Sequence, residues 1–395
     1  MFEYFPGNYV WNLGVVAALN SGGLIDEVDR ACKPIKDAAA HGSDAGTPDF
    51  LRAWTALTDQ LVTQAQDAEK AGHTRTAGQL YFRATNYLAQ AERMLAHSDP
   101  NRVPSYRRVL ELAQKSFELR DPRLSRVEIA YQEGGVGTTL PAYFSAAPAT
   151  DTGPAPVMIM FNGLDSTKEH MYNSQHWAEL AARGISTLMV DPPGSGEALR
   201  LQGLTSRVDT EAWAAACVDY LETRDDVDPT RIGLVGWSLG GYYAPRAAAF
   251  EKRLALVVAW GANHNWGAVQ RRRLQREGER PVPHYWEHVL WVWGFPSDTD
   301  LQEFAAFADQ VHLDGVVEQI DIPFLIAHGE NDRQIPLEYA HRSYDQAVNS
   351  PKRELRVFTP DEGATEHIGL DHLPHVSTFI ADWVADTLAE HPRSR

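Results

Sequence analysis

The chain has 395 residues, of which 44% are hydrophobic and 23% are charged. This length and composition suit a soluble globular protein of two domains, or one large domain with an insertion. Its 36 basic and 53 acidic residues give a net charge of −17, which excludes a nucleic-acid partner, because phosphate binding needs a basic face.

The apolar segments and the cysteines bear on location. The apolar run near the start lacks the basic segment that precedes it in a secretion signal. No stretch approaches the roughly 20 apolar residues that span a bilayer, so we expect no membrane partner. Two cysteines, Cys32 and Cys217, are too few for a disulfide framework. We therefore predict a cytoplasmic protein.

The first part of the chain, to about Asp121, has helical patterns only. Apolar residues recur at three- and four-residue spacing over 48–72, 73–97 and 103–119. Gly72 marks the break between the first two segments. We predict a helical N-terminal domain over residues 1–121.

From Pro122 onward, short β-rich runs alternate with helical patterns. Two runs, 126–132 and 138–146, alternate like a hairpin, and six apolar runs follow at 156–162, 185–191, 231–237, 254–260, 322–329 and 354–359. Apolar strands separated by helices are typical of a doubly wound, mostly parallel α/β sheet. Residues 122–395 are therefore predicted to form one α/β domain, with a helical, tryptophan-rich cap insertion at about 262–319.

The strongest motif lies where one of these runs ends. The segment 231–236 leads directly into Gly236-Trp237-Ser238-Leu239-Gly240, and a helical pattern follows. A G-x-S-x-G between a strand and a helix is the nucleophile turn of the α/β-hydrolase fold. We predict this fold, with Ser238 as its nucleophile.

A serine needs a base and an orienting acid, which follow it in the order acid, then histidine, in this fold. Asp332, just after the run 322–329, is the preferred acid because an acid beyond the strand end can reach under the base. Its alternatives are Glu330 in the same loop and Asp321 before the strand.

The base is expected in the loop after the run 354–359, which holds three histidines. His367 is preferred because it precedes the last helical pattern, whereas His372 and His375 lie at the start of that helix. Surface or capping positions suit those two better.

An oxyanion hole needs backbone N–H groups aimed at the tetrahedral oxygen. One is expected from Leu239, directly after the nucleophile, and the other from the loop after residues 156–162, at Leu164. Three charged residues of that segment, Asp165, Lys168 and Glu169, are expected to hold the loop in place without taking part in the chemistry.

Three segments, FNGLDSTKE (161–169), DPPGSGE (191–197) and GWSLGGYYAPRAA (236–248), carry a family resemblance. They resemble the α/β-hydrolases grouped with 2,6-dihydropseudooxynicotine hydrolase and the fungal polyketide-shortening hydrolases. The resemblance runs from about Arg126 to the C-terminus. It implies a triad of Ser238, Asp332 and His367, a substrate enclosed by the N-terminal helices and the cap, and a homodimer.

The resemblance also implies cleavage of a carbon–carbon bond beside a ketone by some members. The alternative is a plain carboxylesterase or lactonase acting on a bulky aromatic ester. A third hypothesis is a non-catalytic receptor with a hydrolase fold. The nicotine-pathway member has an assisting glutamate after the strand that follows the nucleophile turn. Here no carboxylate lies between Ala262 and Arg276, and His264 or Asn263 could occupy that space.

The aromatic cap favours a small hydrophobic or aromatic substrate. We expect it to contact five residues: Trp237, His264, Trp266, Tyr285 and Trp286. The run of arginines 271–273 is interpreted as a solvated helix face, with a carboxylate or phosphate on the substrate as the alternative. We expect no cofactor and no metal, although His284, Glu287 and His288 match the H-x-x-E-H pattern of zinc peptidases.

Overall fold

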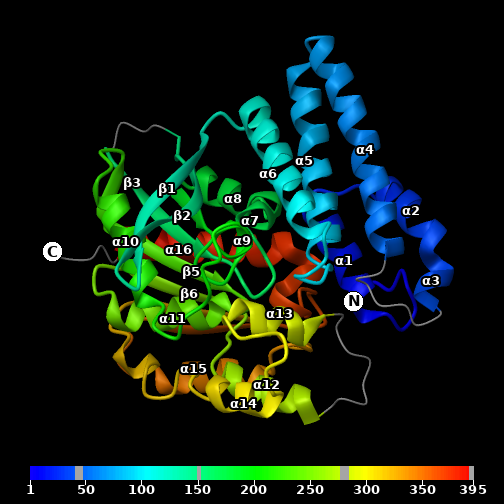
Figure 1. Cartoon of the computed structure of the whole chain (residues 1–395). Helices are drawn as coiled ribbons and strands as arrows, with labels where there is room; N and C mark the ends of the chain where they lie inside the picture. Colours follow the sequence, from blue (N-terminus) through cyan, green and yellow to red (C-terminus); the bar gives the residue numbers. More distant parts are fainter. Residues whose placement is uncertain (41–47, 149–152, 276–283, 391–395) are drawn as a thin grey trace.

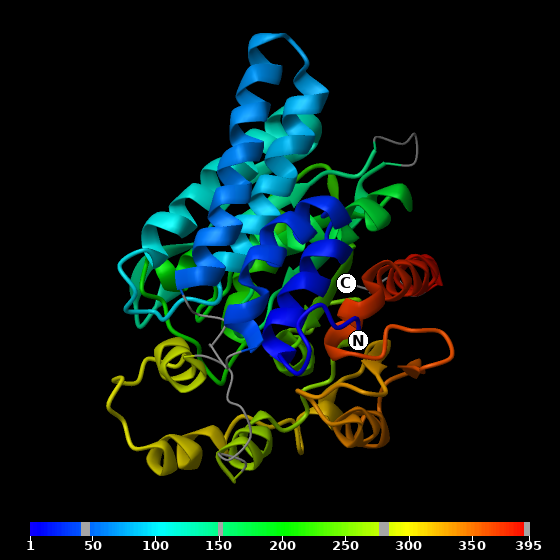
Figure 2. The ribbon, with the colours of Figure 1, turned by 90° about the vertical axis from the view of Figure 1, so that its right-hand side faces the viewer.

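The computed structural model describes residues 1–40, 48–148, 153–275 and 284–390. Its N-terminal part is helical, and Figures 1 and 2 show α4 and α5 projecting as a long pair away from the sheet. The elements are α1 (Tyr9–Asn20), α2 (Ile25–Cys32), η1 (Lys33–Ile35), α3 (Lys36–Ala40), α4 (Pro48–Lys70), α5 (Thr74–Glu92) and α6 (Arg102–Arg120). Their apolar faces form a core of their own, centred on Trp11, Trp54 and Tyr87.

An eight-stranded sheet follows, in the order β1-β2-β4-β3-β5-β6-β7-β8. β1 and β2 form an antiparallel hairpin, β2 pairs antiparallel with β4, and all other pairs are parallel. The strands are β1 (Leu124–Glu133), β2 (Val136–Ser145), β3 (Ala155–Phe161), β4 (Ser186–Val190), β5 (Val227–Trp237), β6 (Leu256–Trp260), β7 (Phe324–Gly329) and β8 (Arg353–Phe358). The predicted mostly parallel α/β-hydrolase sheet is confirmed.

Helices cover both faces of the sheet, because alternate residues of each buried strand point to opposite sides. Ile159, Leu234 and Val257 enter the core under α10 and α11, whereas Met160 and Val258 enter the core under α8 and α16. The helices of this part are α7 (Lys168–Ser174), α8 (His176–Ala182), α9 (Gly196–Arg200), α10 (Glu211–Glu222), α11 (Gly240–Phe250), α15 (Leu337–Gln346), η3 (His367–His372) and α16 (Leu373–Glu390).

A helical segment lies between β6 and β7, at the place expected for the cap (Figure 1). Its elements are α12 (Trp266–Gln275), α13 (Tyr285–Val292), α14 (Leu301–Ala308) and η2 (Val317–Gln319). Trp266, Val289 and Phe304 join it to the core on the α11 side of the sheet. None of the helices in the described ranges is long and apolar enough to cross a membrane.

Candidate active site

Ser238 lies in the sharp turn between β5 and α11, in the left-handed region with φ of +59°. An L-residue adopts this conformation at a cost in free energy, so the surrounding structure must hold it there. The Ser238 N–H donates to the carbonyl of Trp260, 2.9 Å away at the end of β6. This bond ties the turn to the neighbouring strand.

The glycines around the turn are required by close backbone contacts. A Cβ at Gly236 would lie 2.0 Å from the carbonyl oxygen of Gly240, and one at Gly241 would lie 2.1 Å from that of Gly261. Such distances are well inside van der Waals contact, so only glycine fits at either position.

The structure brings Ser238, His367 and Asp332 together from three loops at the carboxyl ends of the strands. His367 Nε2 lies 2.8 Å from Ser238 Oγ, and its Nδ1 lies 2.9 Å from Asp332 Oδ2. Burial would raise the pKa of the Asp332 carboxyl, but His367 and the Ile335 N–H hold it below its usual value. The ionised Asp332 accepts from Nδ1–H, which leaves Nε2 free to accept the serine proton.

The alternatives to these two partners lie elsewhere. Glu330 is exposed, and Asp321 forms an ion pair with Lys252 at 3.5 Å. The rings of His372 and His375 stack on each other, with centroids 5.3 Å apart. The backbone next to His367 is held in place at Ile368. This residue has φ of +50°, and its carbonyl accepts from Trp260 Nε1 at 2.7 Å.

The loop after β3 passes directly over Ser238. A Cβ at Gly163 would lie 2.8 Å from the Ser238 Cβ, so the glycine lets this loop approach the serine. In the part of the chain that the structure describes, the backbone N–H groups of Leu164 and Leu239 have no protein acceptor. Both remain available to a ligand oxygen at this place.

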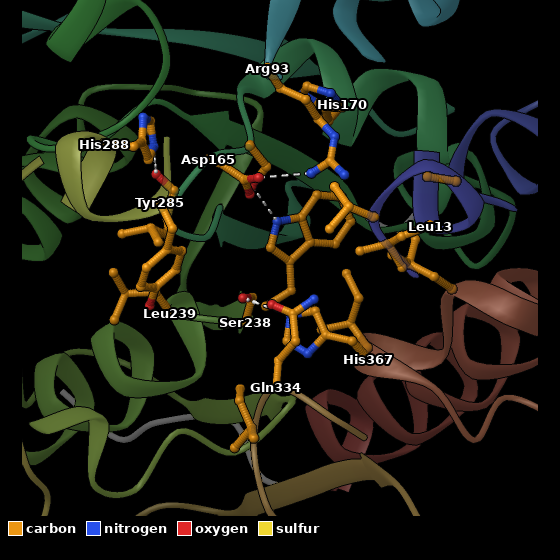
Figure 3. A pocket seen from close by; sticks show the side chains of 18 of the residues that line it. Leu13, Arg93, Asp165, His170, Ser238, Leu239, Tyr285, His288, Gln334 and His367 are labelled. Atoms are coloured by element: carbon orange, nitrogen blue, oxygen red, sulfur yellow. Dashed lines mark hydrogen bonds and ion pairs between the residues drawn. The ribbon is translucent and has the colours of Figure 1, made fainter. Parts of the chain in front are cut away.

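Side chains from three directions fix this loop. Ser166 Oγ accepts from the Gly163 N–H at 2.9 Å and from Trp237 Nε1 at 3.1 Å. From the cap, His288 Nε2 lies 3.0 Å from the Leu164 carbonyl oxygen. From the N-terminal part, Arg93 Nη1 donates to Asp165 Oδ2 at 2.7 Å. The loop therefore depends on the docking of both helical segments (Figure 3).

A buried charge cluster lies at the start of α7, beside the loop. Lys168 Nζ is fully buried and lies 2.8–3.0 Å from carboxylate oxygens of Glu169, Asp191 and Glu197. Asp191 Oδ1 also accepts from Asn162 Nδ2 at 2.8 Å and from the Lys168 N–H at 2.7 Å. Burial opposes the lysine charge, but the three carboxylates raise its pKa above the usual value. Paired in this way, the charges anchor both ends of the loop.

Ser238 opens into a cavity bounded by all three parts of the chain. The sheet side contributes Trp237, Asn263 and His367, and the cap contributes Trp266 and Tyr285. Helix α1 forms a further wall of the cavity, and the sequence analysis did not identify its residues. They are Tyr9, Val10, Leu13 and Ala17. Figure 3 shows Leu13 on the side of the cavity opposite Tyr285.

Two of the five expected substrate contacts lie away from this cavity. His264 is fully buried and lies between Ser343 Oγ at 2.9 Å and Asp314 Oδ1 at 3.0 Å. Trp286 packs edge-on against the Tyr285 ring, with centroids 5.1 Å apart, and does not line the cavity. Asn263, the alternative to His264 in this segment, lines the cavity instead.

The H-x-x-E-H residues do not converge on one point: His284 Nδ1 lies 3.6 Å from Glu287 Oε2, but His288 faces the loop after β3. Glu287 accepts from Ser98 Oγ at 2.8 Å, whereas His288 contacts the Leu164 carbonyl. This role of His288, and that of Arg93, could not be predicted from the sequence, because each partner lies more than 70 positions away along the chain.

The three consecutive arginines of α12 also have different surroundings. Arg271 pairs with Asp309 and Arg272 with Glu338 on the protein surface. Arg273 lines the cavity, with its guanidinium 4.1 Å from the centre of the Tyr285 ring. Only this third arginine can face a ligand.

Comparisons with known proteins agree with the fold. The model of the alpha/beta hydrolase family matches residues 158–386. The chain is 28% identical to 2,6-dihydropseudooxynicotine hydrolase of Paenarthrobacter nicotinovorans over 85% of this chain and 83% of that protein. It is 32% identical to hydrolase acrC of Aspergillus aculeatus, over 69% of this chain and 66% of the relative.

Solved structures also agree with this fold. The crystal structure of 2,6-dihydroxy-pseudo-oxynicotine hydrolase superposes with a TM-score of 0.73 and 25% identity, covering 96% of this chain and 98% of that one. The structure of AbyA5 has a TM-score of 0.62 at 20% identity, covers 92% of this chain and 95% of that one, and shows likeness in fold alone. The first likeness includes the N-terminal helices and the cap, because it spans nearly all of both chains.

Proposed function

This chain belongs to the alpha/beta hydrolase family and is a hydrolase, and we propose that it cleaves a carbon–carbon bond next to a ketone in a bulky aromatic substrate. The observation that carries the proposal is the chain of contacts from Ser238 Oγ through His367 to Asp332. It opens into a cavity with tryptophan and tyrosine walls. The similarity to a hydrolase of 2,6-dihydropseudooxynicotine supports the choice of a ketone over an ester.

In the proposed first step, His367 Nε2 takes the proton of Ser238, and Oγ adds to the ketone carbon. Asp332 stabilises the imidazolium that forms. The oxyanion accepts hydrogen bonds from the N–H groups of Leu239 and Leu164, which lie on rigid backbone and need no reorganisation. Gly163 permits the close approach that this step needs.

In the second step, the bond between the carbonyl carbon and its neighbouring carbon breaks. Its electron pair passes to an enolate or an electron-rich ring, because an unstabilised carbanion is too poor a leaving group. The carbon takes the proton from His367 Nε2. Water, activated by the same nitrogen, then hydrolyses the acyl-serine, so that a β-diketone and one water give a carboxylic acid and a ketone.

The test is a matched panel of 1-phenylbutane-1,3-dione and phenyl butanoate, offered to the wild type and to Ser238→Ala. We expect the diketone to give one acid and one ketone at a rate that Ser238→Ala reduces by about 10⁴-fold or more. Fast ester hydrolysis, with diketone turnover no higher in the wild type than in Ser238→Ala, would establish an esterase instead.

We also propose that the protein is a cytoplasmic homodimer. The family resemblance supports the dimer, and the two free, buried cysteines Cys32 and Cys217 fit a reducing compartment. Light scattering should then give twice the 44.0 kDa mass of one chain. A mass equal to that of one chain at micromolar concentration would refute the dimer.

A further inference from the structure

Asp165 presents to the cavity a hydrogen-bond acceptor that takes no part in holding the loop after β3. Its Oδ2 accepts from Arg93 Nη1 at 2.7 Å, and among the described residues Oδ1 has no hydrogen-bond partner. The side chain is 45% exposed, and the residue lines the cavity, so this open surface faces the cavity. Figure 3 shows Asp165 between Arg93 on one side and Tyr285 and His288 on the other.

Asp165 is ionised, and it is the only carboxylate among the described residues that line the cavity. Burial would raise its pKa, but Arg93 and nearby histidines hold it below the usual value. Two of those histidines, His170 and His288, are neutral near pH 7, because burial lowers their pKa values to about 4 and about 3.

The other fixed charges of the cavity lining are the guanidinium groups of Arg93 and Arg273. Two positive groups against one negative group disfavour a cationic ligand. Before a substrate binds, water can hydrate the free oxygen of Asp165. A bulky substrate expels that water, and the carboxylate then keeps a partner only if the substrate supplies a donor.

We propose that Asp165 is a specificity-determining residue that selects aromatic substrates bearing a neutral hydroxyl group, whose O–H donates to the free carboxylate oxygen. The inference deepens the proposed function and rests on it for the aromatic ketone. Arg93 holds the carboxylate in place and balances its charge, so that it does not oppose the oxyanion forming near Leu164. A hydroxyl fits better than an ammonium group because of the two arginines.

The experiment measures binding, so that it does not depend on turnover. In a Ser238→Ala background, quenching of tryptophan fluorescence gives the Kd of 1-phenylbutane-1,3-dione and of its three monohydroxyphenyl and three monomethoxyphenyl analogues. Trp237 and Trp266 line the cavity and report on binding. At least one hydroxyl isomer should bind about 10- to 100-fold tighter than the parent, as a hydrogen bond to a charged group gives, and its methoxy analogue should not.

Asp165→Asn should reduce this preference to within about threefold, because it removes the charge. Asp165→Ala removes the acceptor entirely and serves the same purpose if the first variant does not fold. The matched control is Asp309→Asn, which removes a surface carboxylate of the cap that pairs with Arg271 and should keep the full preference.

The proposal is overturned if no hydroxyl isomer binds tighter than the parent, if a methoxy analogue gains as much, or if the preference survives in both Asp165 variants. Failure of all seven ligands to bind overturns it as well. Ligands that bind with the expected preference, but that the intact enzyme does not cleave, would contradict the proposed reaction and leave the hydroxyl selectivity supported.

Discussion

Gly163→Ala tests whether the loop after β3 supplies part of an oxyanion hole. The added Cβ would lie 2.8 Å from the Ser238 Cβ and 3.1 Å from its Oγ. Two carbon atoms pack at roughly 3.5–4.0 Å, so the loop or the serine must move by about 1 Å. The φ angle of Gly163 is not positive, and the substitution therefore acts through this contact and not through backbone strain.

This displacement of about 1 Å is larger than the range of donor–oxyanion distances at which catalysis works. Oxyanion donors act at about 2.7–3.1 Å, and removal of one donor costs about 10²- to 10³-fold in kcat. A displacement of about 1 Å carries the Leu164 N–H out of this range. We therefore expect kcat to fall by about 10²- to 10³-fold, or about 3–4 kcal/mol in activation free energy, with a much smaller change in KM.

The assay compares kcat and KM of the wild type, Gly163→Ala and Gly137→Ala on whichever substrate shows Ser238-dependent turnover. Gly137 lies in β2 with no atom within 4 Å of an added Cβ, so its variant is the matched control and should stay within about twofold in rate. Thermal unfolding confirms that both variants fold. A folded Gly163→Ala variant that keeps kcat within threefold of the wild type would show that this loop supplies no oxyanion donor.

Three further predictions concern the histidine, the acid and the buried charges. His367→Ala should lower kcat/KM by about 10⁴-fold or more, whereas His372→Ala should stay within about threefold; equal losses in steady-state assays would mean that the base is misassigned. Asp332→Asn should lower kcat by about 10⁴-fold, because Nδ1 loses its ionised acceptor; full activity would exclude this role. Burial opposes the Glu197 charge, but Arg126 and Lys168 lower its pKa from 4.5 to about 2, and this stabilisation is present above pH 4.5 and is lost toward pH 2. Glu197→Gln should therefore lower the free energy of unfolding by about 3 kcal/mol at pH 7 and by about 1 kcal/mol at pH 3 in urea titrations, and a pH-independent difference would contradict this origin.

The sheet could be predicted because buried strands have continuous apolar sequences. Each of the eight runs overlaps a strand of the sheet, since segments such as 156–162 and 254–260 bury both faces. The turn at Ser238 could also be predicted, because Gly236 and Gly240 approach each other within the motif itself. The boundary near Asp121 between a helical domain and a catalytic domain stays a prediction.

The side-chain contacts around the site could not be predicted in the same way. His264 follows the same strand as Asn263, but the sequence does not say which of two neighbours faces the cavity. The structure turns His264 toward Ser343 and Asp314, which lie 79 and 50 positions away. Contacts of this kind depend on how the loops pack in three dimensions, for which the local pattern carries no signal.

Reaction with a fluorophosphonate, followed by peptide mass spectrometry, tests most directly whether Ser238 is an activated nucleophile. We expect one adduct per chain, located on Ser238, absent from Ser238→Ala and formed far more slowly in His367→Ala. A folded wild-type protein that forms no adduct, or forms it on another serine, would contradict the account.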